Sequence, residues 1–421
     1  MWEIAGQPIT VIARVKPGLV DQLDALLTCI GASIDQQQLI QFGNLKSLHF
    51  VAWLIIANDP EFPPDLVMEA TYDGDEKAFF DMLLKYGAAG LDAIYSHCED
   101  YPSRGSQDES AVKEYLSARV EPSAAVFVGI PGLTVESILS AVSVRKKVDT
   151  FIDGAYANGE LRGLPNEEVV SWVANSVKRG LVPDVRVSPI TLAAQKRTAA
   201  INQGLLLAFL VVTGIILVPL LVVYLIAIRL LELKEGKDEI RPPTWSDLRL
   251  FDRQNSVQNH LATVLRVKAG RTRKNTLRGV LWVVNGLTKK LMLTTQTPRV
   301  SATVHFARWL FIDKGQRLLF LTNFDGTWEG YLGEFGDRLT RLILTAIWSN
   351  TEGFPPSKFL FFGGAKDVDA FKRSAREHGV FAPLWYRAYP DETILNLRRD
   401  MQIRDIVAGA PSQPQALAEL L

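Results

Sequence analysis

An internal repeat constrains the fold of this chain more than any other feature of its sequence. Arg14–Gly18 matches Arg266–Gly270, 252 positions later, and Ala93–Pro102 matches Ala346–Pro355, 253 positions later. Three further pairs occur in the same order: His49–Trp53 with His305–Trp309, Tyr72–Gly74 with Phe324–Gly326, and Val126–Gly129 with Leu360–Gly363. Because four of the five offsets lie between 252 and 256, the repeat indicates duplication of a whole domain.

Each copy has the pattern of a βαββαβ unit. Strand, helix, two strands, helix and late strand are expected in this order, and the late strands are placed at Ala125–Val128 and Phe359–Phe362. This is the ferredoxin-like arrangement, whose antiparallel sheet needs a cover on its second face. We therefore expect an α+β protein in which two ferredoxin-like repeats pair into one α/β barrel.

A long apolar segment separates the copies. No charged residue occurs from Thr198 to Ile228, a length that predicts a membrane segment. A shared barrel requires both copies on one side of a membrane, which favours a hairpin bent near Gly214 or Pro219. A single span, with each copy pairing with another chain, stays open.

The expected organisation has six parts. They are repeat one (1–155), a helical linker (156–197), the membrane segment, hairpin or spanning helix (198–231), a second linker (232–254), repeat two (255–400) and a C-terminal tail (401–421).

Charge and cysteine content limit the function classes. Lys and Arg equal Asp and Glu at 46 each, which argues against nucleic acid as the main partner. The two cysteines form no disulfide framework, and from the first residues of the sequence we expect no signal peptide. We expect a membrane location with cytoplasmic folded domains, membrane lipids and a small molecule as partners, and we leave a homo-oligomer open.

His305 is the first candidate for chemistry. A histidine among apolar strand residues serves as a haem ligand, another metal ligand or a general base; the alternative is a hydrogen-bonded core histidine. Asp325 follows the next strand, so we consider it an acid paired with His305, or a helix cap. Arg308 has only Ala52 as its counterpart and suits a carboxylate such as a haem propionate.

Asn350 and Glu352 complete the candidate cofactor site. Both lie in a polar loop before Pro355. Glu352 is considered either to orient a ligand or to bond the backbone of its own loop. The polar residues without counterparts in repeat one, Arg308 and Gln258–His260, place the expected site in repeat two.

The element order and duplication resemble the dimeric α/β-barrel superfamily, which includes dye-decolourising peroxidases and chlorite dismutases. The motifs His305-Phe-x-x-Trp309, Phe324-Asp-Gly-Thr-Trp328 and Asn350-Thr-Glu-Gly-Phe-Pro355 are similar to those of bacterial peroxidase-like proteins. Thr322-Asn323-Phe324 departs from the Gly-x-x-Asp-Gly motif of the dye-decolourising enzymes.

The resemblance implies a membrane-attached oxidoreductase, peroxidase-like and haem-dependent, with its pocket in repeat two. The alternative is a non-catalytic, membrane-anchored binding or scaffold protein that holds a lipid-like or other small ligand.

Overall fold

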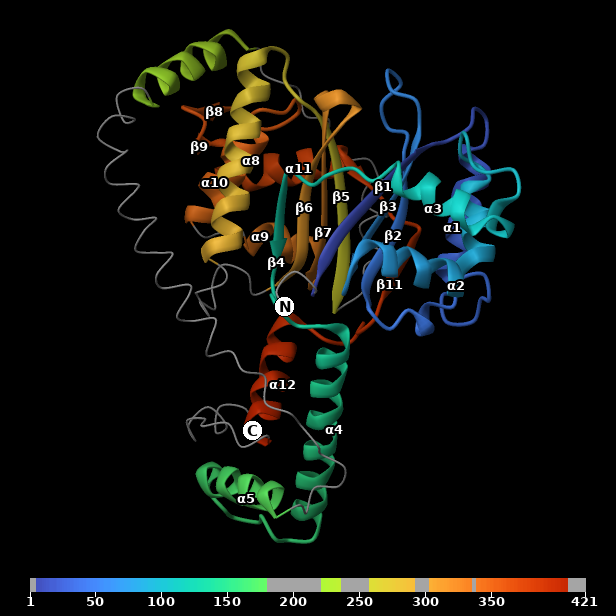
Figure 1. Cartoon of the computed structure of the whole chain (residues 1–421). Helices are drawn as coiled ribbons and strands as arrows, with labels where there is room; N and C mark the ends of the chain where they lie inside the picture. The colour runs from blue at the N-terminus through green and yellow to red at the C-terminus, as the bar shows by residue number, and fades with distance from the viewer. Residues whose placement is uncertain (1–4, 180–220, 236–256, 292–302, 335–337, 408–421) are drawn as a thin grey trace.

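The protein, seen as a computed structural model that describes residues 5–179, 221–235, 257–291, 303–334 and 338–407, is a mixed α/β structure with several sheets. Two sheets lie between two groups of helices (Figure 1). The strands are β1 (Gln7–Arg14), β2 (Leu48–Ile56), β3 (Asp65–Tyr72), β4 (Ala125–Val128), β5 (Gln258–Arg266), β6 (Val304–Ile312), β7 (Arg317–Asp325), β8 (Ser357–Lys358), β9 (Phe362–Gly363), β10 (Gly379–Val380) and β11 (Leu384–Arg387).

The helices cover the outer faces of the sheets or project away from them. They are α1 (Val20–Ala32), α2 (Glu76–Tyr95), α3 (Glu109–Ser117), α4 (Val135–Ala157), α5 (Asn166–Lys178), α8 (Arg271–Leu291), α9 (Trp328–Glu334), α10 (Arg338–Trp348), α11 (Val368–Glu377) and α12 (Ile394–Val407), with a further helix over 221–234.

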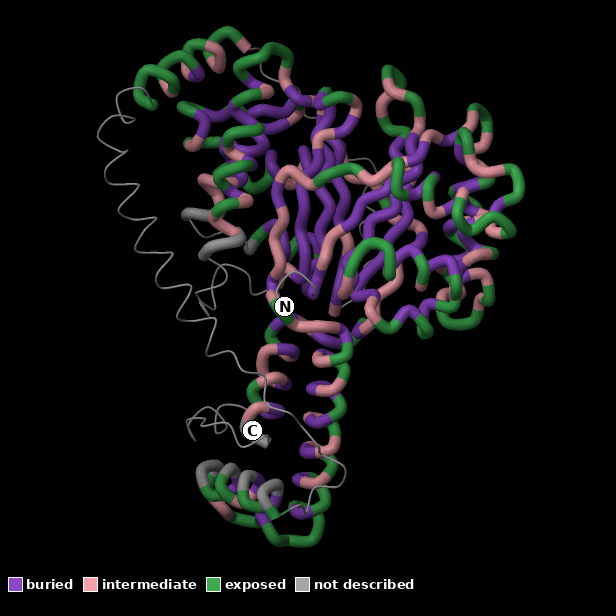
Figure 2. The backbone as a smooth tube through the Cα atoms, in the orientation of Figure 1, coloured by how far each residue is buried: buried purple, intermediate pink, exposed green. Residues whose placement is uncertain are grey.

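Alternation of side chains along the strands produces three apolar layers. The outer face of the sheet β1-β3-β2-β11 packs against α1, α2 and α3, and that of β10-β5-β7-β6-β4 packs against α8 to α11. A third cluster, which includes Leu54, Val67, Leu310 and Leu319, fills the space between the sheets. Figure 2 shows that the long strands at the centre of the sheets are mostly buried; they are β2, β3, β5, β6 and β7. We call these two facing sheets the two-sheet core.

Each half of the chain completes the sheet of the other half. After α3, Glu121 donates its backbone N–H to Thr10 on β1, and β4 then pairs with β6. After α11, β10 pairs with β5, and β11 then pairs with β2. These two crossing segments join the sheets at both edges, so the core cannot be divided into two independent units.

Helices α4 and α12 form a stalk. Both begin at the same end of the two-sheet core and run away from it side by side, and α5 lies across their far ends (Figure 1). Arg145 of α4 holds the pair together: its guanidinium lies 3.0 Å from Asp149, 3.1 Å from Glu392 and 3.0 Å from Asp400 on α12.

The expected late strand of the second half, Phe359–Phe362, is wrong. Only β9, at Phe362–Gly363, is a strand there, and it pairs with β8 in a separate two-stranded sheet. Phe359 and Leu360 have positive φ angles of 52° and 69°, a turn conformation that interrupts any strand. The counterpart of β4 is instead β11, 259 positions later.

The expected membrane segment over 198–231 is also wrong. None of the helices in the described ranges has the length and apolar character needed to cross a bilayer. The predictions of a transmembrane protein and of a membrane location rested on this segment and are wrong for the same reason. Residues 198–220 lie outside the described residues, whereas the helix over 221–234 packs Ile228 against Ala346 and Leu360.

Replacing Arg145 tests the stalk. Arg145→Met leaves Asp400, whose side chain is completely buried, with only Arg399 at 3.8 Å as a cationic partner, so we expect a loss of about 3 kcal/mol in the free energy of unfolding. Burial already raises the pKa of Asp400, although Arg145 opposes that shift. Without Arg145 the pKa rises further, and the folded variant then binds the proton more tightly than the unfolded chain does.

The destabilisation should therefore be smaller at mildly acidic than at neutral pH, measured by urea unfolding. Lys146→Met, at an exposed neighbouring position, is the matched control and should change little. An equal effect of the two substitutions would contradict the role of Arg145.

Candidate functional site

Two histidines occupy equivalent irregular positions in the sheets. The pairing of β6 with β7 skips His305, because Val304 faces Phe324 and Phe306 faces Asn323. The pairing of β2 with β3 skips His49 in the same way. Each histidine is thus the extra residue of a β-bulge, which redirects a side chain from the regular alternation. Regular alternation along β6 would place His305 on one face with Ala307 and Trp309, and the bulge breaks that alternation.

His305 and Asp325 form a buried pair. His305 Nε2 lies 2.7 Å from Asp325 Oδ1, and the two side chains are 1% and 6% exposed. The other carboxylate oxygen accepts a 2.7 Å hydrogen bond from the backbone N–H of Ile394, the first residue of α12. Asp325 therefore holds the histidine and caps the stalk helix α12. The helix that directly follows it, α9, is capped instead by Thr327, whose Oγ1 accepts from the N–H of Gly330 at 3.1 Å.

His49 and Asp73 repeat this arrangement in the first half. His49 Nε2 lies 2.9 Å from Asp73 Oδ1, and Asp73 Oδ2 accepts from the N–H of Val135, the first residue of α4, at 2.7 Å. Tyr389 adds a third member, because its hydroxyl lies 2.8 Å from His49 Nδ1. Burial and the two nearby aspartates raise the pKa of Tyr389 well above its usual value, which keeps its proton available for donation to His49.

Aromatic rings separate the two pairs. Phe50 lies 5.3 Å from His305 and 5.7 Å from Phe306, and Phe306 lies 5.4 Å from His49, all between ring centroids in edge-on geometry. His305 Nδ1 is buried and meets no hydrogen-bond partner within the described ranges. The pair in the second half thus lacks the third member that Tyr389 supplies in the first.

Arg308 lies between the sheets, in a separate polar cluster. It donates to the carbonyl oxygens of Ile9 and Ala70 at 2.8 and 2.9 Å and to Thr71 Oγ1 at 2.6 Å. Its Nε lies 3.8 Å from Glu69 Oε2. The Arg308 guanidinium, from the second half, therefore binds backbone carbonyl groups and the Glu69 carboxylate of the first half.

Glu69 is the centre of that cluster. Its Oε1 lies 2.7 Å from His260 Nε2 and 3.3 Å from Asn323 Nδ2, and Trp385 donates to Asn323 Oδ1 at 2.9 Å. Burial acts to raise the pKa of Glu69, but His260 and Arg308 outweigh it and hold that pKa below its usual value. Glu69 is consequently ionised and paired with residues of the opposite half.

Asn350 and Glu352 do not join His305. They flank Thr351, which pairs with Val267 just beyond the last residue of β5, whereas Gln258 and His305 lie at the other end of that strand. Asn350 bonds the carbonyl oxygen of Ala346, and Glu352 is exposed and donates its backbone N–H to Arg266. The expected cofactor set of His305, Arg308, Asn350 and Glu352 is therefore spread over three places.

A haem does not fit this arrangement. Axial ligation needs a ring nitrogen that faces the iron, whereas His305 is 1% exposed, holds Asp325 through Nε2 and is flanked by the rings of Phe50 and Tyr389. Arg308 is likewise enclosed and does not reach toward a propionate. In the part of the chain that the structure describes, no three His, Cys, Asp or Glu side chains converge as metal ligands.

No family model, curated protein or solved structure matches this chain.

The sequence analysis did not identify Glu69 or Tyr389 as site residues. Both occupy positions where the other half has an apolar residue, Leu321 and Ile130 respectively. Such unmatched polar residues were the signal used for Arg308. For Tyr389 this signal was not visible, because the sequence matched the strand at Ala125–Val128 with Phe359–Phe362. The structural counterpart of that strand is β11, which Tyr389 follows.

A double-mutant cycle tests the cluster between the sheets. Arg308→Met leaves the buried Glu69 carboxylate with His260 as its remaining ionic partner, so we expect a loss of about 3 kcal/mol of unfolding free energy. The double variant Glu69→Met/Arg308→Met removes both charges and should lose about 2 kcal/mol less than the sum of the single variants. Chemical unfolding of the four proteins measures this coupling, and additive effects would rule it out.

Proposed function

We propose that this chain is a non-catalytic binding protein, in which the two-sheet core holds the stalk for a partner protein. The observation that carries the proposal is the double use of Asp73 and Asp325. In both halves one carboxylate oxygen holds a histidine, and the other caps a stalk helix. An ionised carboxylate at a helix N-terminus is stabilising, so each pair fixes the direction in which its helix leaves the core.

The same geometry argues against an oxidoreductase at His305. A general base needs its nitrogen within hydrogen-bond reach of a substrate proton. His305 and His49 are 1% exposed or less, and Phe50, Phe306 and Tyr389 pack against them. A structural role accounts for the histidine–aspartate pair in both halves. An active site in the second half accounts only for the pair of His305 with Asp325.

The stalk offers a surface for the partner. A groove of about 730 Å³ runs along α4; among the described residues it is lined by Leu139, Val142, Ser143, Lys146, Lys147, Thr150 and Phe151. Steps of three and four residues place these side chains on one helical face, and Leu139 is 43% exposed. An apolar stripe with two lysines fits an amphipathic helix that carries acidic residues.

Matched histidine variants test whether the chain is a binding protein or a haem-dependent enzyme. His49→Gln and His305→Gln each keep an N–H for the aspartate but lose the ring packing, so both should lose about 1–3 kcal/mol of unfolding free energy. Added haem should keep the broad absorption of free haem and gain no sharp, shifted band of bound haem, with wild type or with either variant. A haem band that disappears only in His305→Gln, together with peroxide-dependent dye oxidation, would contradict the proposal.

Photo-crosslinking tests the groove directly. Benzoylphenylalanine at position 139, within the groove, should form a specific protein adduct in cells that make the chain. The charge reversal Lys146→Glu/Lys147→Glu should reduce that adduct at least tenfold, because it repels an acidic partner. Asp24 on α1 is exposed and lies outside the stalk, and crosslinker placed there is the control. Equal adducts at both positions, insensitive to charge reversal, would refute the groove.

A further inference from the structure

The two halves differ at two core positions beneath their outer helices. Strand register makes Thr263 the counterpart of Val11, because Val11 faces Met68 and Thr263 faces Phe320 in equivalent ladders. The capping residues Asp108 and Asp367 align α3 with α11, which makes Ser374 the counterpart of Tyr115. The second half thus has two small hydroxyl residues where the first has an isopropyl group and a phenol.

In the first half this space is filled. Tyr115 is 5% exposed, and its ring lies 6.0 Å from that of Tyr95 and 5.2 Å from that of Tyr101. Its hydroxyl donates to the carbonyl oxygen of Glu99 at 3.1 Å. The phenol therefore satisfies both the packing and the hydrogen bonding of this layer.

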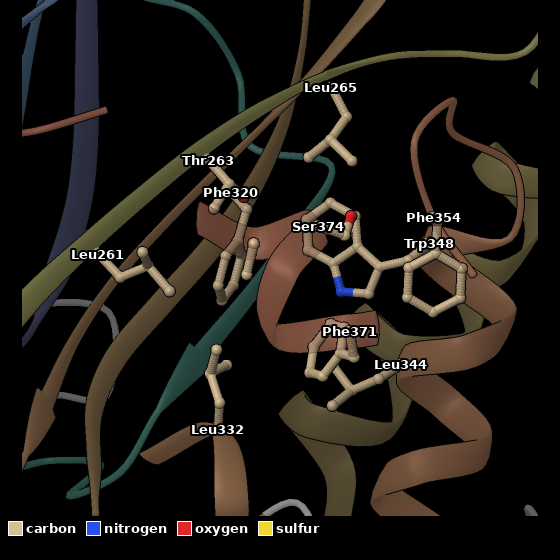
Figure 3. Close-up of a pocket in the computed structure, with 11 residues that line it drawn as sticks. Leu261, Thr263, Leu265, Phe320, Leu332, Leu344, Trp348, Phe354, Phe371 and Ser374 are labelled. Carbon is tan, nitrogen blue, oxygen red and sulfur yellow. The ribbon is translucent and has the colours of Figure 1, made fainter. Parts of the chain in front are cut away.

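In the second half the same layer contains a cavity of about 30 Å³. Its lining comes from β5, β7 and helices α9, α10 and α11, and Figure 3 shows Leu332, Leu344, Phe371 and Ser374 around one space. Trp348 and Phe354 replace the rings of Tyr95 and Tyr101 there. Apart from Thr263 and Ser374, the lining side chains are apolar.

The hydroxyl of Thr263 is the feature that points to a ligand. Thr263 is 3% exposed, and its Oγ1 has no hydrogen-bond partner among the residues described. A buried hydroxyl without a partner is costly, and valine at this position in the first half shows that the fold does not need it. The cavity thus combines an apolar wall with one unsatisfied polar atom.

We propose that this cavity binds a small, mainly apolar molecule with one hydrogen-bonding group, of the class of short aliphatic alcohols. A single water needs roughly 10–15 Å³ of such space, so the cavity has room for about three non-hydrogen atoms. The ligand hydroxyl bonds Thr263 Oγ1, and its carbon atoms contact the leucine and aromatic side chains. This site is separate from the groove on α4 and does not depend on the proposed function.

Ethanol is the probe for this site. In the full chain with ¹³C-labelled leucine methyl groups, NMR titration should give saturable shifts for Leu261, Leu332 and Leu344, which line the cavity. Leu23, Leu27 and Leu83 in the core of the first half are internal controls and should not saturate. Equal, non-saturating shifts in both halves would show solvent effects only and would overturn the proposal.

Substitutions at the two positions that differ between the halves define the chemistry. Thr263→Val keeps the shape but removes the hydroxyl, and should weaken ethanol binding about five- to tenfold. Ser374→Leu fills the cavity and should abolish the saturable shifts; Ser374→Val replaces it if the larger residue prevents folding. Unchanged affinity in Thr263→Val would overturn the role of the hydroxyl, and unchanged binding in the Ser374 variants would place the ligand elsewhere.

Discussion

The exchange of edge strands between the two halves is the constraint on which the rest of the structure depends. Strand β4 of the first half pairs with β6, and β11 of the second half pairs with β2. Because each crossing segment also bonds the edge of its own sheet, the two sheets are held face to face at both sides. The helices that follow β4 and β11 therefore begin at one end of the core, where they pack as a stalk.

Buried polar groups fix how the halves fit together. Taking Glu69 and Arg308 out of water is expensive, and their attraction compensates only when the geometry is favourable. Glu69 meets His260, Asn323 and Arg308, all from the opposite half. Such contacts discriminate strongly against a shifted arrangement, because a shift leaves charges buried without partners. The polar residues that the two halves do not share thus act chiefly between the halves.

Sequence reasoning predicted the regular elements better than the site. In both halves the first strand, the first helix and the next two strands occur in the expected order: β1, α1, β2 and β3, and then β5, α8, β6 and β7. The second helix expected in the first half is α2, over Glu76–Tyr95. Local propensity did not reveal the four-residue strand β11. The apolar run at 359–362 was a better match to a strand and was therefore assigned as the late strand of the second half.

The site was partly predictable for a physical reason. The repeat paired His49 with His305 and placed each before an Asp-Gly turn, and the structure brings each histidine within 3 Å of its aspartate. The bulges could not be foreseen, because a skipped residue leaves no mark on the alternation of hydrophobic and polar residues. Contacts between halves, such as Glu69 with Arg308, require the relative placement of two sheets, which neither repeat encodes alone.

Strand exchange also has a consequence for biosynthesis. Strand β2 ends at Ile56, yet its partner β11 is complete only at Arg387. At roughly 5–20 residues per second, the ribosome leaves that strand edge open for some tens of seconds after β2 has emerged. An open, apolar strand edge is a template for aggregation. The nascent chain therefore depends on protection of this edge, by a chaperone or by its own later segments, until almost the whole polypeptide has been translated.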